Sequence, residues 1–592
     1  MLSAELKRIQ IRKRWTLLDS YCFIARFLCR HESQSAGAGS GPPSGDCPLP
    51  SHLSAIPVRE FHDYFVTHLP SSSLHHERTP IYNKLPRSAS VPHRENPRSA
   101  PHAALQAPAV TTRDTTVVRI PLRSAKHHFG VAISRGNRLT NEDTYQAGVI
   151  DIPAFAKRAP RSLTLAERRA AAENSVNVAD NANSDPQVFY YGVFDGHGGA
   201  ECSEFLRERL HEYIQEAAAE FELGSSLQRS RQPGLNIRTQ STLAKAGRNP
   251  TYLEGEKPLV QPANRLKLGE AETELVKRYR SLIGGYYRRF RPAHFKYDAQ
   301  DLSNDFGTAN EPRYREGASM EEILEYAFLK ADLDFVSAQA YKQDEDDIVQ
   351  ADQPLNECDI LYSPSRLRPH DPDARPIGGP KRFKGGSTAS IAMLSAPSAM
   401  PYWHPSAAST LLVSHVGDTR VILCATASGV AFPVTISHHP SSPVEANRLR
   451  RFSHTFISDS FGEERISGLA NTRAFGDISA KRLGVSSEPQ LTRIDIGPAE
   501  YSFLVLISDG VTNALTDQEI CDVIKESRTP EQGAREVVSL ATEVSPSGDN
   551  ATCLAVRLGG WERRLEGGFG SMATKESRQW KREEANNFRR LR

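Results

Sequence analysis

Five carboxylates in this sequence stand where an apolar segment begins or ends. They are Glu142, Asp143, Asp195, Asp509 and Asp549. Asp195 and Asp509 each close a run of apolar residues, and each is followed by glycine. Apolar runs of this length are typical of buried strands. If the strand ends bring these side chains to one edge of a sheet, their oxygens form the hard donor set that Mg²⁺ and Mn²⁺ prefer.

Each of these acids, taken alone, has a simpler explanation. An Asp-Gly pair is a common turn, and an aspartate ahead of a helix often caps it. Asp195 lies in such a context, because "DGHGG" is followed by the helical pattern of residues 200–221. A capping role leaves the other acids unexplained, so the repeated pattern favours a metal site.

The elements that would position these acids follow from apolar periodicity. The predicted strands cover residues 115–122, 127–137, 187–194, 410–416, 420–426, 502–508 and 551–558. The predicted helices cover 200–221, 319–342 and 516–525. Polar blocks near 153–185, 223–317 and 343–383 interrupt this pattern. Because strands of matching character resume after each block, we interpret the blocks as insertions into one domain.

Composition argues against several classes of protein. The 592 residues carry a formal charge of only +2, whereas nucleic-acid binders usually have a strong basic surplus. The 8 cysteines form no CxxC pair, so a zinc ribbon or disulfide scaffold is not expected. No apolar run approaches the length of a membrane-spanning helix. We therefore expect a soluble protein without a nucleic-acid partner. We also expect it to be a monomer.

The N-terminal part of the chain has a different character. Residues 1–34 are basic, amphipathic and poor in acids, which is typical of a mitochondrial presequence. A helix packed on the domain or an irregular N-terminal extension could have the same composition. Residues 35–115 are rich in Ser, Pro, His, Ala and Gly and are predicted to be a mostly disordered linker. Within them, 56–69 is predicted to be a local helix or a docking motif. We expect mitochondrial localisation, with the cytoplasm as the alternative.

Eight motifs, taken in order, resemble the protein phosphatase 2C family of metal-dependent Ser/Thr phosphatases. They are "RGNRLTNED", "VFDGHGGAECSEFL", "KGGSTASIAML", "SHVGDTRVIL", "ISHHPSSPVEANRL", "ISGLANTRAFGD", "VLISDGVTNAL" and "PSGDNATCLAV". The resemblance spans roughly residues 128–558 and is typical of a fungal-like member with long insertions. It implies an α+β fold, a four-layer α/β/β/α sandwich with two central antiparallel sheets and metals at one end. The domain would cover residues 116–560, followed by a charged tail at 561–592.

The resemblance also implies roles for particular residues. Two Mn²⁺ or Mg²⁺ ions would bind, with a weaker site for a third. A water that bridges the two ions would attack the phosphate of phosphoserine or phosphothreonine in a phosphoprotein, and no phospho-enzyme would form. The implied metal site consists of Glu142, Asp143, Asp195, Gly196 through its carbonyl, Asp418, Asp509 and Asp549. Asp418 would serve the third ion. Arg138 would clamp the substrate phosphate, and His197 would be the general acid for the departing alkoxide.

The match is imperfect at two places, and two alternatives remain. Asn513 stands where the family often has an aspartate, and His438 precedes His439 where the family often has Asp-His. One alternative is a weakly active or inactive scaffold that binds phosphoproteins or partners through its insertions. The other is an RNA or lipid binder that uses the basic and aromatic segment 274–295, although an amphipathic hairpin docked on the domain explains that segment more simply.

Overall fold

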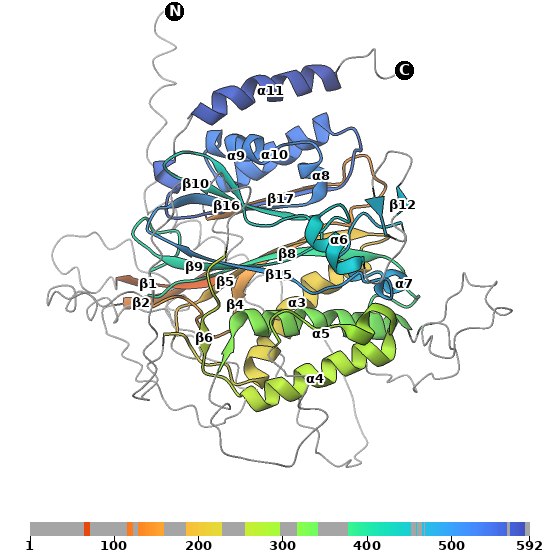
Figure 1. The fold of residues 1–592 in the computed structure, drawn as a ribbon. Helices are drawn as coiled ribbons and strands as arrows, with labels where there is room; N and C mark the ends of the chain where they lie inside the picture. Colours follow the sequence, from red (N-terminus) through yellow and green to blue (C-terminus); the bar gives the residue numbers. More distant parts are fainter. Residues whose placement is uncertain are drawn as a thin grey trace, which may run out of the picture. The chain divides into compact units, whose positions relative to one another are not determined.

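The chain is described here from a computed structural model (Figure 1). The structure describes residues 64–70, 115–121, 128–158, 185–227, 255–295, 317–340, 342, 377–398, 400–450, 457–458, 464–466, 468–564 and 569–586. The predicted presequence lies outside the described residues. The same holds for most of the predicted linker and for large parts of the predicted insertions.

The chain divides into two compact units. One consists of Met1–Val58 and Val66–Val118, and the other of Arg59–Phe65 and Arg119–Arg592. Strands β1 (Tyr64–Pro70) and β2 (Thr115–Pro121) form a two-stranded sheet. The helix predicted for 56–69 is therefore wrong over its described part. The residues of "YFVTHL" form a strand by pairing with β2, which lies far along the chain, and the local pattern does not reveal this pairing.

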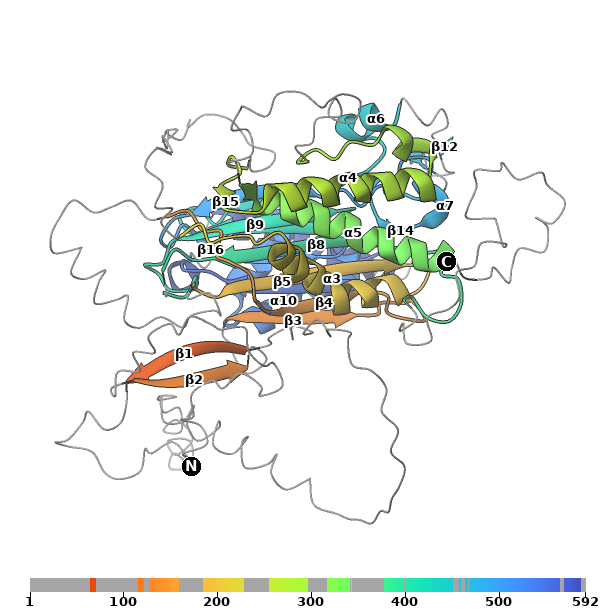
Figure 2. The same cartoon turned by 90° about the horizontal axis from the view of Figure 1, so that it is seen from below.

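Two antiparallel sheets form the centre of the second unit (Figures 1 and 2). In the first sheet the neighbouring strands are, in order, β15 (Gln490–Ile496), β9 (Ser409–Val416), β8 (Gly386–Ser395), β5 (Val188–His197) and β4 (Thr144–Ile150). The short strand β14 (Phe475–Gly476) also pairs with β8. The second has the order β11–β10–β16–β17–β3, and its strands are β11 (Ala431–Pro433), β10 (Arg420–Ala425), β16 (Tyr501–Ile507), β17 (Ala551–Arg557) and β3 (Phe129–Ser134).

Side-chain alternation along β5 explains why the two sheets stack. Phe189, Tyr191 and Val193 belong to the apolar core between the sheets. Tyr190 and Phe194 belong to the core that the first sheet shares with its helices. Successive side chains of a strand point to opposite faces, so an unbroken apolar run such as "VFYYGVF" fits a strand buried on both sides.

Helices cover both outer faces of this pair of sheets. The first sheet is covered by α3 (Glu201–Glu220) and α5 (Met320–Ala340), with α4 (Arg265–Leu282) packed against α5 (Figure 1). The second sheet is covered by α9 (Asp517–Glu526) and α10 (Pro530–Val544). The predicted four-layer α/β/β/α sandwich is thus confirmed. Shorter elements are β6 (Val260–Gln261), η4 (Gly285–Arg289), β7 (Ala318–Ser319), α6 (Pro443–Leu449), β12 (Ile457–Ser458), β13 (Glu464–Arg465), α7 (Ile478–Lys481), α8 (Asp509–Thr512) and η9 (Trp561–Arg563).

The tail beyond the last strand also forms a helix, α11 (Phe569–Ala585). It packs against α9, since Lys581 lies 2.7 Å from Glu519 and Arg578 lies 2.9 Å from Glu526. Among the helices that the structure describes, none is long and apolar enough to cross a membrane.

The basic and aromatic segment 274–295 is docked on the domain. Tyr279 and Tyr287 are fully buried, and their rings stack at 4.6 Å with an interplanar angle of 7°. Tyr286 and Phe290 are also buried. Because these aromatic rings are covered, they cannot stack on nucleic-acid bases, and the RNA-binding alternative loses the feature on which it rested.

Candidate active site

The predicted acids meet at one end of the two sheets. Asp195 lies near the C-terminal end of β5, and the pairing of Thr144 with Phe194 brings Asp143 beside it. Asp509 follows β16 of the other sheet and begins α8. The backbone N–H of Asp509 donates to Asp195 Oδ2 at 3.2 Å. This contact joins the two sheets at the point where both strands end.

Burial and mutual repulsion dominate the electrostatics of this group. Burial, followed by the charges of Asp143, Asp509 and Asp418, raises the pKa of Asp195 well above its usual range. Burial and neighbouring carboxylates raise the pKa of Asp509 to about 8. Burial raises the pKa of Asp143 to about 6, although Thr552 donates to its Oδ2 at 2.7 Å. Four carboxylates therefore face one another here at a cost in free energy.

The loop that carries Arg138 and Glu142 is fixed by Asn550. The Asn550 Oδ1 accepts from the backbone N–H of Glu142 at 2.8 Å, and its Nδ2 donates to the carbonyls of Arg135 and Thr140 at 2.9 and 3.0 Å. Arg138 is more than half exposed and donates to Asp549 Oδ2 at 2.7 Å. Sequence reasoning missed Asn550. Its place directly after Asp549 was the available signal.

Glycine at position 196 lets β5 approach the Glu142 carbonyl and the start of α3 closely. A Cβ on Gly196 would lie 2.5 Å from the carbonyl oxygen of Glu142 and 2.9 Å from Ser203 Oγ. The Ser203 hydroxyl donates to that same carbonyl at 2.6 Å. Gly198 and Gly199 adopt positive φ angles of 73° and 125°. The glycines of "DGHGG" therefore serve close approach and a left-handed turn, which leaves Asp195 and His197 beside the other acids.

His197 has a partner that sequence reasoning did not single out. Its Nε2 lies 2.9 Å from both carboxylate oxygens of Asp477, and since a carboxylate only accepts, Nε2 donates. Burial alone would lower the pKa of His197, but the hydrogen bond and charge of Asp477 outweigh it and the pKa is raised. Asp477 is the last residue of the quoted motif "ISGLANTRAFGD", so the signal was present.

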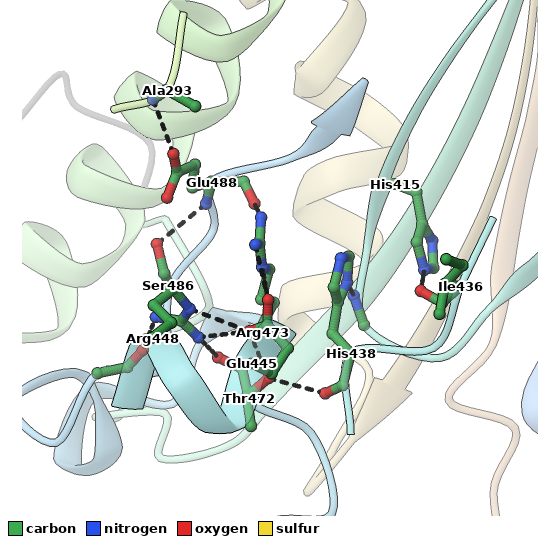
Figure 3. A network of polar contacts seen from close by, with 12 residues as sticks. Ala293, His415, Ile436, His438, Glu445, Arg448, Thr472, Arg473, Ser486 and Glu488 are labelled. Carbon is green, nitrogen blue, oxygen red and sulfur yellow. Dashed lines mark hydrogen bonds and ion pairs between the residues drawn. The ribbon is translucent and has the colours of Figure 1, made fainter. Parts of the chain in front are cut away.

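Asp418, the predicted ligand of a third ion, lies near this group. Its Oδ2 accepts from Asn471 Nδ2 at 2.9 Å, and burial raises its pKa. The preceding residue, Gly417, donates its N–H to His438 Nδ1 at 3.0 Å. His438 is buried and stacks on His415 with 4.7 Å between ring centroids (Figure 3). His438 thus contacts the loop that carries Asp418.

The residues present are chemically suited to a divalent cation. Asp143 Oδ1 is buried without a hydrogen-bond partner, and Asp143, Asp195, Asp418 and Asp509 have no Lys or Arg ion partner among the residues that the structure describes. Within those same ranges, no three His, Cys, Asp or Glu side chains are grouped closely enough to hold one ion by themselves. Mg²⁺ commonly keeps several waters and takes only one or two carboxylates. The donor set therefore fits Mg²⁺ or Mn²⁺ bound partly through water.

Comparison with known proteins identifies the family. Residues 360–549 match the family model described as Protein phosphatase 2C. A relative in Schizosaccharomyces pombe, Protein phosphatase 2C homolog 4, is 29% identical over 453 residues, which is 76% of this chain and 85% of that protein. The chain belongs to the protein phosphatase 2C family. Members of this family are protein phosphatases, which are hydrolases, and this chain is therefore a protein phosphatase.

Other members of the protein phosphatase 2C family match over shorter ranges. Protein phosphatase 1K, mitochondrial, of Xenopus laevis is 34% identical over 152 residues, which cover 26% of this chain and 40% of that protein. Among solved structures, the serine-threonine phosphatase 2C from Toxoplasma gondii aligns with a TM-score of 0.37 and 15% identity, over 73% of this chain and 94% of that one.

One departure from the protein phosphatase 2C pattern lies at the site itself. Asn513 directly follows α8, and its Nδ2 lies 3.4 Å from Asp509 Oδ2. An amide at this position can donate to Asp509 but adds no negative charge.

Proposed function

We propose that the chain is a metal-dependent protein Ser/Thr phosphatase that hydrolyses phosphoserine and phosphothreonine esters. The observation that carries this proposal is the contact of Asp509 with Asp195, which joins the strand-end acids of both sheets. Two Mn²⁺ or Mg²⁺ ions would be held by Asp195, Gly196, Asp509 and Asp549, with Glu142 and Asp143 supporting them and Asp418 serving a weaker third ion. When bound, such ions lower the pKa of water and offset the charge of phosphate.

The chain's own residues would bind the phosphate and supply a proton. Arg138 is exposed enough to reach a ligand, and its planar guanidinium suits two phosphate oxygens at once. Its present partner, Asp549, would be free to turn to a cation. His197 would donate a proton to the departing Ser or Thr oxygen. Because Nε2 faces Asp477, the ring nitrogen available for this step is Nδ1.

Hydrolysis of a phosphothreonine peptide by the full chain tests the proposal. We expect turnover with Mn²⁺ or Mg²⁺, none with chelator, and a loss of at least about a hundredfold in Asp195→Asn and Asp509→Asn, because each removes a ligand charge. Asp495→Asn is the matched control: it also removes a carboxylate, but one that pairs with Lys157 at 2.8 Å on β15. It should retain wild-type turnover.

The opposite result would point to the scaffold alternative. If the folded wild-type chain binds Mn²⁺ and still shows no turnover on phosphoserine or phosphothreonine peptides, catalysis is excluded as its role. Phosphopeptide binding without turnover would then be the activity to measure.

We also propose a mitochondrial address. It is supported by the basic, acid-poor composition of residues 1–34 and by the name of the Xenopus relative, Protein phosphatase 1K, mitochondrial. A fusion of residues 1–40 to a fluorescent protein should enter mitochondria. A purely cytosolic signal would remove this proposal and leave the phosphatase assignment intact.

A further inference from the structure

The conformation of Asp477 is unusual and is held from several sides. Its φ of 45° and ψ of 49° lie in the left-handed region, which residues other than glycine rarely adopt. Its backbone N–H donates to the carbonyl of Gly385 at 2.9 Å. A Cβ on Gly386 would lie 2.4 Å from Asp477 Oδ2, and one on Gly385 would lie 2.1 Å from the carbonyl oxygen of His197. The glycine pair of "KGGSTA" thus lets the Asp477 carboxylate approach His197.

A fully buried ion pair lies under the loop that carries Asp477. Asp332 of α5 and Lys481 of α7 lie 2.8 Å apart with neither side chain exposed. Asp332 Oδ1 also accepts from the backbone N–H of Gly476 at 2.9 Å. Lys481 donates to the carbonyl of Ala474 at 2.8 Å. The ion pair therefore fixes the backbone on both sides of Phe475 and immediately before Asp477.

Helix α4, which lies in the predicted insertion 223–317, reaches this ion pair. The hydroxyl of Tyr279 shares its proton between the carbonyl of Leu329 at 2.7 Å and Asp332 Oδ2 at 2.9 Å. Figures 1 and 2 both show α4 beside α5, with α7 near one end of the pair. The same insertion contacts the chain just beyond α7, where the N–H of Ala293 donates to Glu488 at 2.9 Å (Figure 3).

We propose that Asp477 is a positioning residue for His197, and that helix α4 of the insertion fixes the loop bearing Asp477 through the Tyr279–Asp332 contact. The order of contacts runs from Tyr279 to Asp332, from Asp332 to Gly476, and from Asp477 to His197 Nε2. The role of the insertion is thereby to hold the ring of His197 in one orientation, with Nδ1 turned toward the reacting oxygen. The catalytic part of this inference rests on the proposed function.

Three conservative variants test the proposal by steady-state kinetics on a phosphothreonine peptide. Asp477→Asn should lower kcat about tenfold or more and leave KM within about twofold, since a general acid contributes about a hundredfold or more when correctly placed. Tyr279→Phe keeps the stacked ring and should lower kcat by about two- to tenfold, the worth of one hydrogen bond. The double variant should be no slower than Asp477→Asn alone, because both substitutions act through one loop.

Tyr213→Phe is the matched control. Its hydroxyl donates to Asp334 at 3.2 Å, so this substitution also removes a tyrosine contact to an aspartate of α5, but one that does not touch the Asp477 loop. It should keep the wild-type kcat. If Tyr213→Phe and Tyr279→Phe lower kcat equally, or if the double variant shows the product of both losses, the proposed connection is wrong.

A readout independent of turnover separates this inference from the proposed function. In metal-free protein labelled with ¹⁵N-histidine, the His197 ring signals, assigned by their loss in His197→Gln, should report a proton on Nε2. Asp477→Asn should shift these signals, and Tyr279→Phe should broaden or shift them. Unchanged signals in Asp477→Asn would overturn the proposal. Shifted signals in a protein without phosphatase activity would leave the positioning role standing and remove the proposed function.

Discussion

Addition of Mn²⁺ to the metal-free protein is expected to raise the free energy of unfolding by about 4 kcal/mol when the ion is at a thousandfold excess over its Kd. The physical reason is the group formed by Asp143, Asp195, Asp418 and Asp509, whose buried and partly buried carboxylates face one another without a Lys or Arg partner in the described part of the chain. A divalent cation removes that repulsion only in the folded state, because the unfolded chain does not bring these residues together. Denaturant unfolding with Mn²⁺ and with chelator measures the difference.

Asp509→Asn should change this result in a characteristic way. Without metal, the variant should be at least as stable as the wild type, because one repelling charge is gone while the amide can still accept a hydrogen bond. On addition of Mn²⁺, its free energy of unfolding should rise much less than that of the wild type. Asp495→Asn, whose carboxylate pairs with Lys157, should respond to Mn²⁺ as the wild type does. An equal gain in Asp509→Asn and the wild type would show that Mn²⁺ binds elsewhere.

The central strands could be predicted from the sequence because their signal is local. The runs at 187–194, 502–508 and 551–558 correspond to β5, β16 and β17, since apolar runs this long are stable only when covered on both faces. β15 and helix α10 were missed. "QLTRIDI" mixes charged and apolar residues and becomes a strand by pairing with β9, so its stability comes from a neighbour far along the chain.

The candidate site divides in the same way. Carboxylates at strand ends could be singled out because the end of an apolar run is visible in the sequence. The contacts between loops could not, because they join residues far apart. Asn550 bonds to Glu142 across 408 positions, and His197 to Asp477 across 280. The packing of the sheets, and not the local sequence, decides which polar residues of the loops form such contacts.

Glu445→Gln is expected to lower the free energy of unfolding by about 3–5 kcal/mol at pH 7, because it leaves two largely buried arginines without their countercharge. Glu445 Oε1 accepts from Arg473 at 2.7 Å, and Oε2 accepts from Arg448 at 2.7 Å and from the Thr472 hydroxyl at 2.7 Å (Figure 3). The Glu445 side chain is 1% exposed. Denaturant unfolding of the variant and the wild type measures the loss.

The dependence of this loss on pH identifies charge as its cause. Burial alone would raise the pKa of Glu445, but the charges of Arg473 and Arg448 outweigh it and lower the pKa from 4.5 to about 2. A folded-state pKa below the unfolded value contributes stability above pH 4.5, and this contribution, about 3 kcal/mol, is lost as the pH falls toward 2. The difference between wild type and Glu445→Gln should therefore shrink between pH 5 and pH 3.

An exposed ion pair supplies the control for that measurement. Glu531 pairs with Arg535 at 3.0 Å on the surface of α10, and Glu531→Gln should cost no more than about 1 kcal/mol, because water already solvates both charges. If Glu445→Gln costs as little as Glu531→Gln, the two arginines are satisfied by other groups. A cost for Glu445→Gln that is the same at pH 7 and pH 3 would instead assign the stabilisation to packing. The predicted decrease at low pH is expected only if the buried carboxylate is charged in the folded protein and balances both arginines.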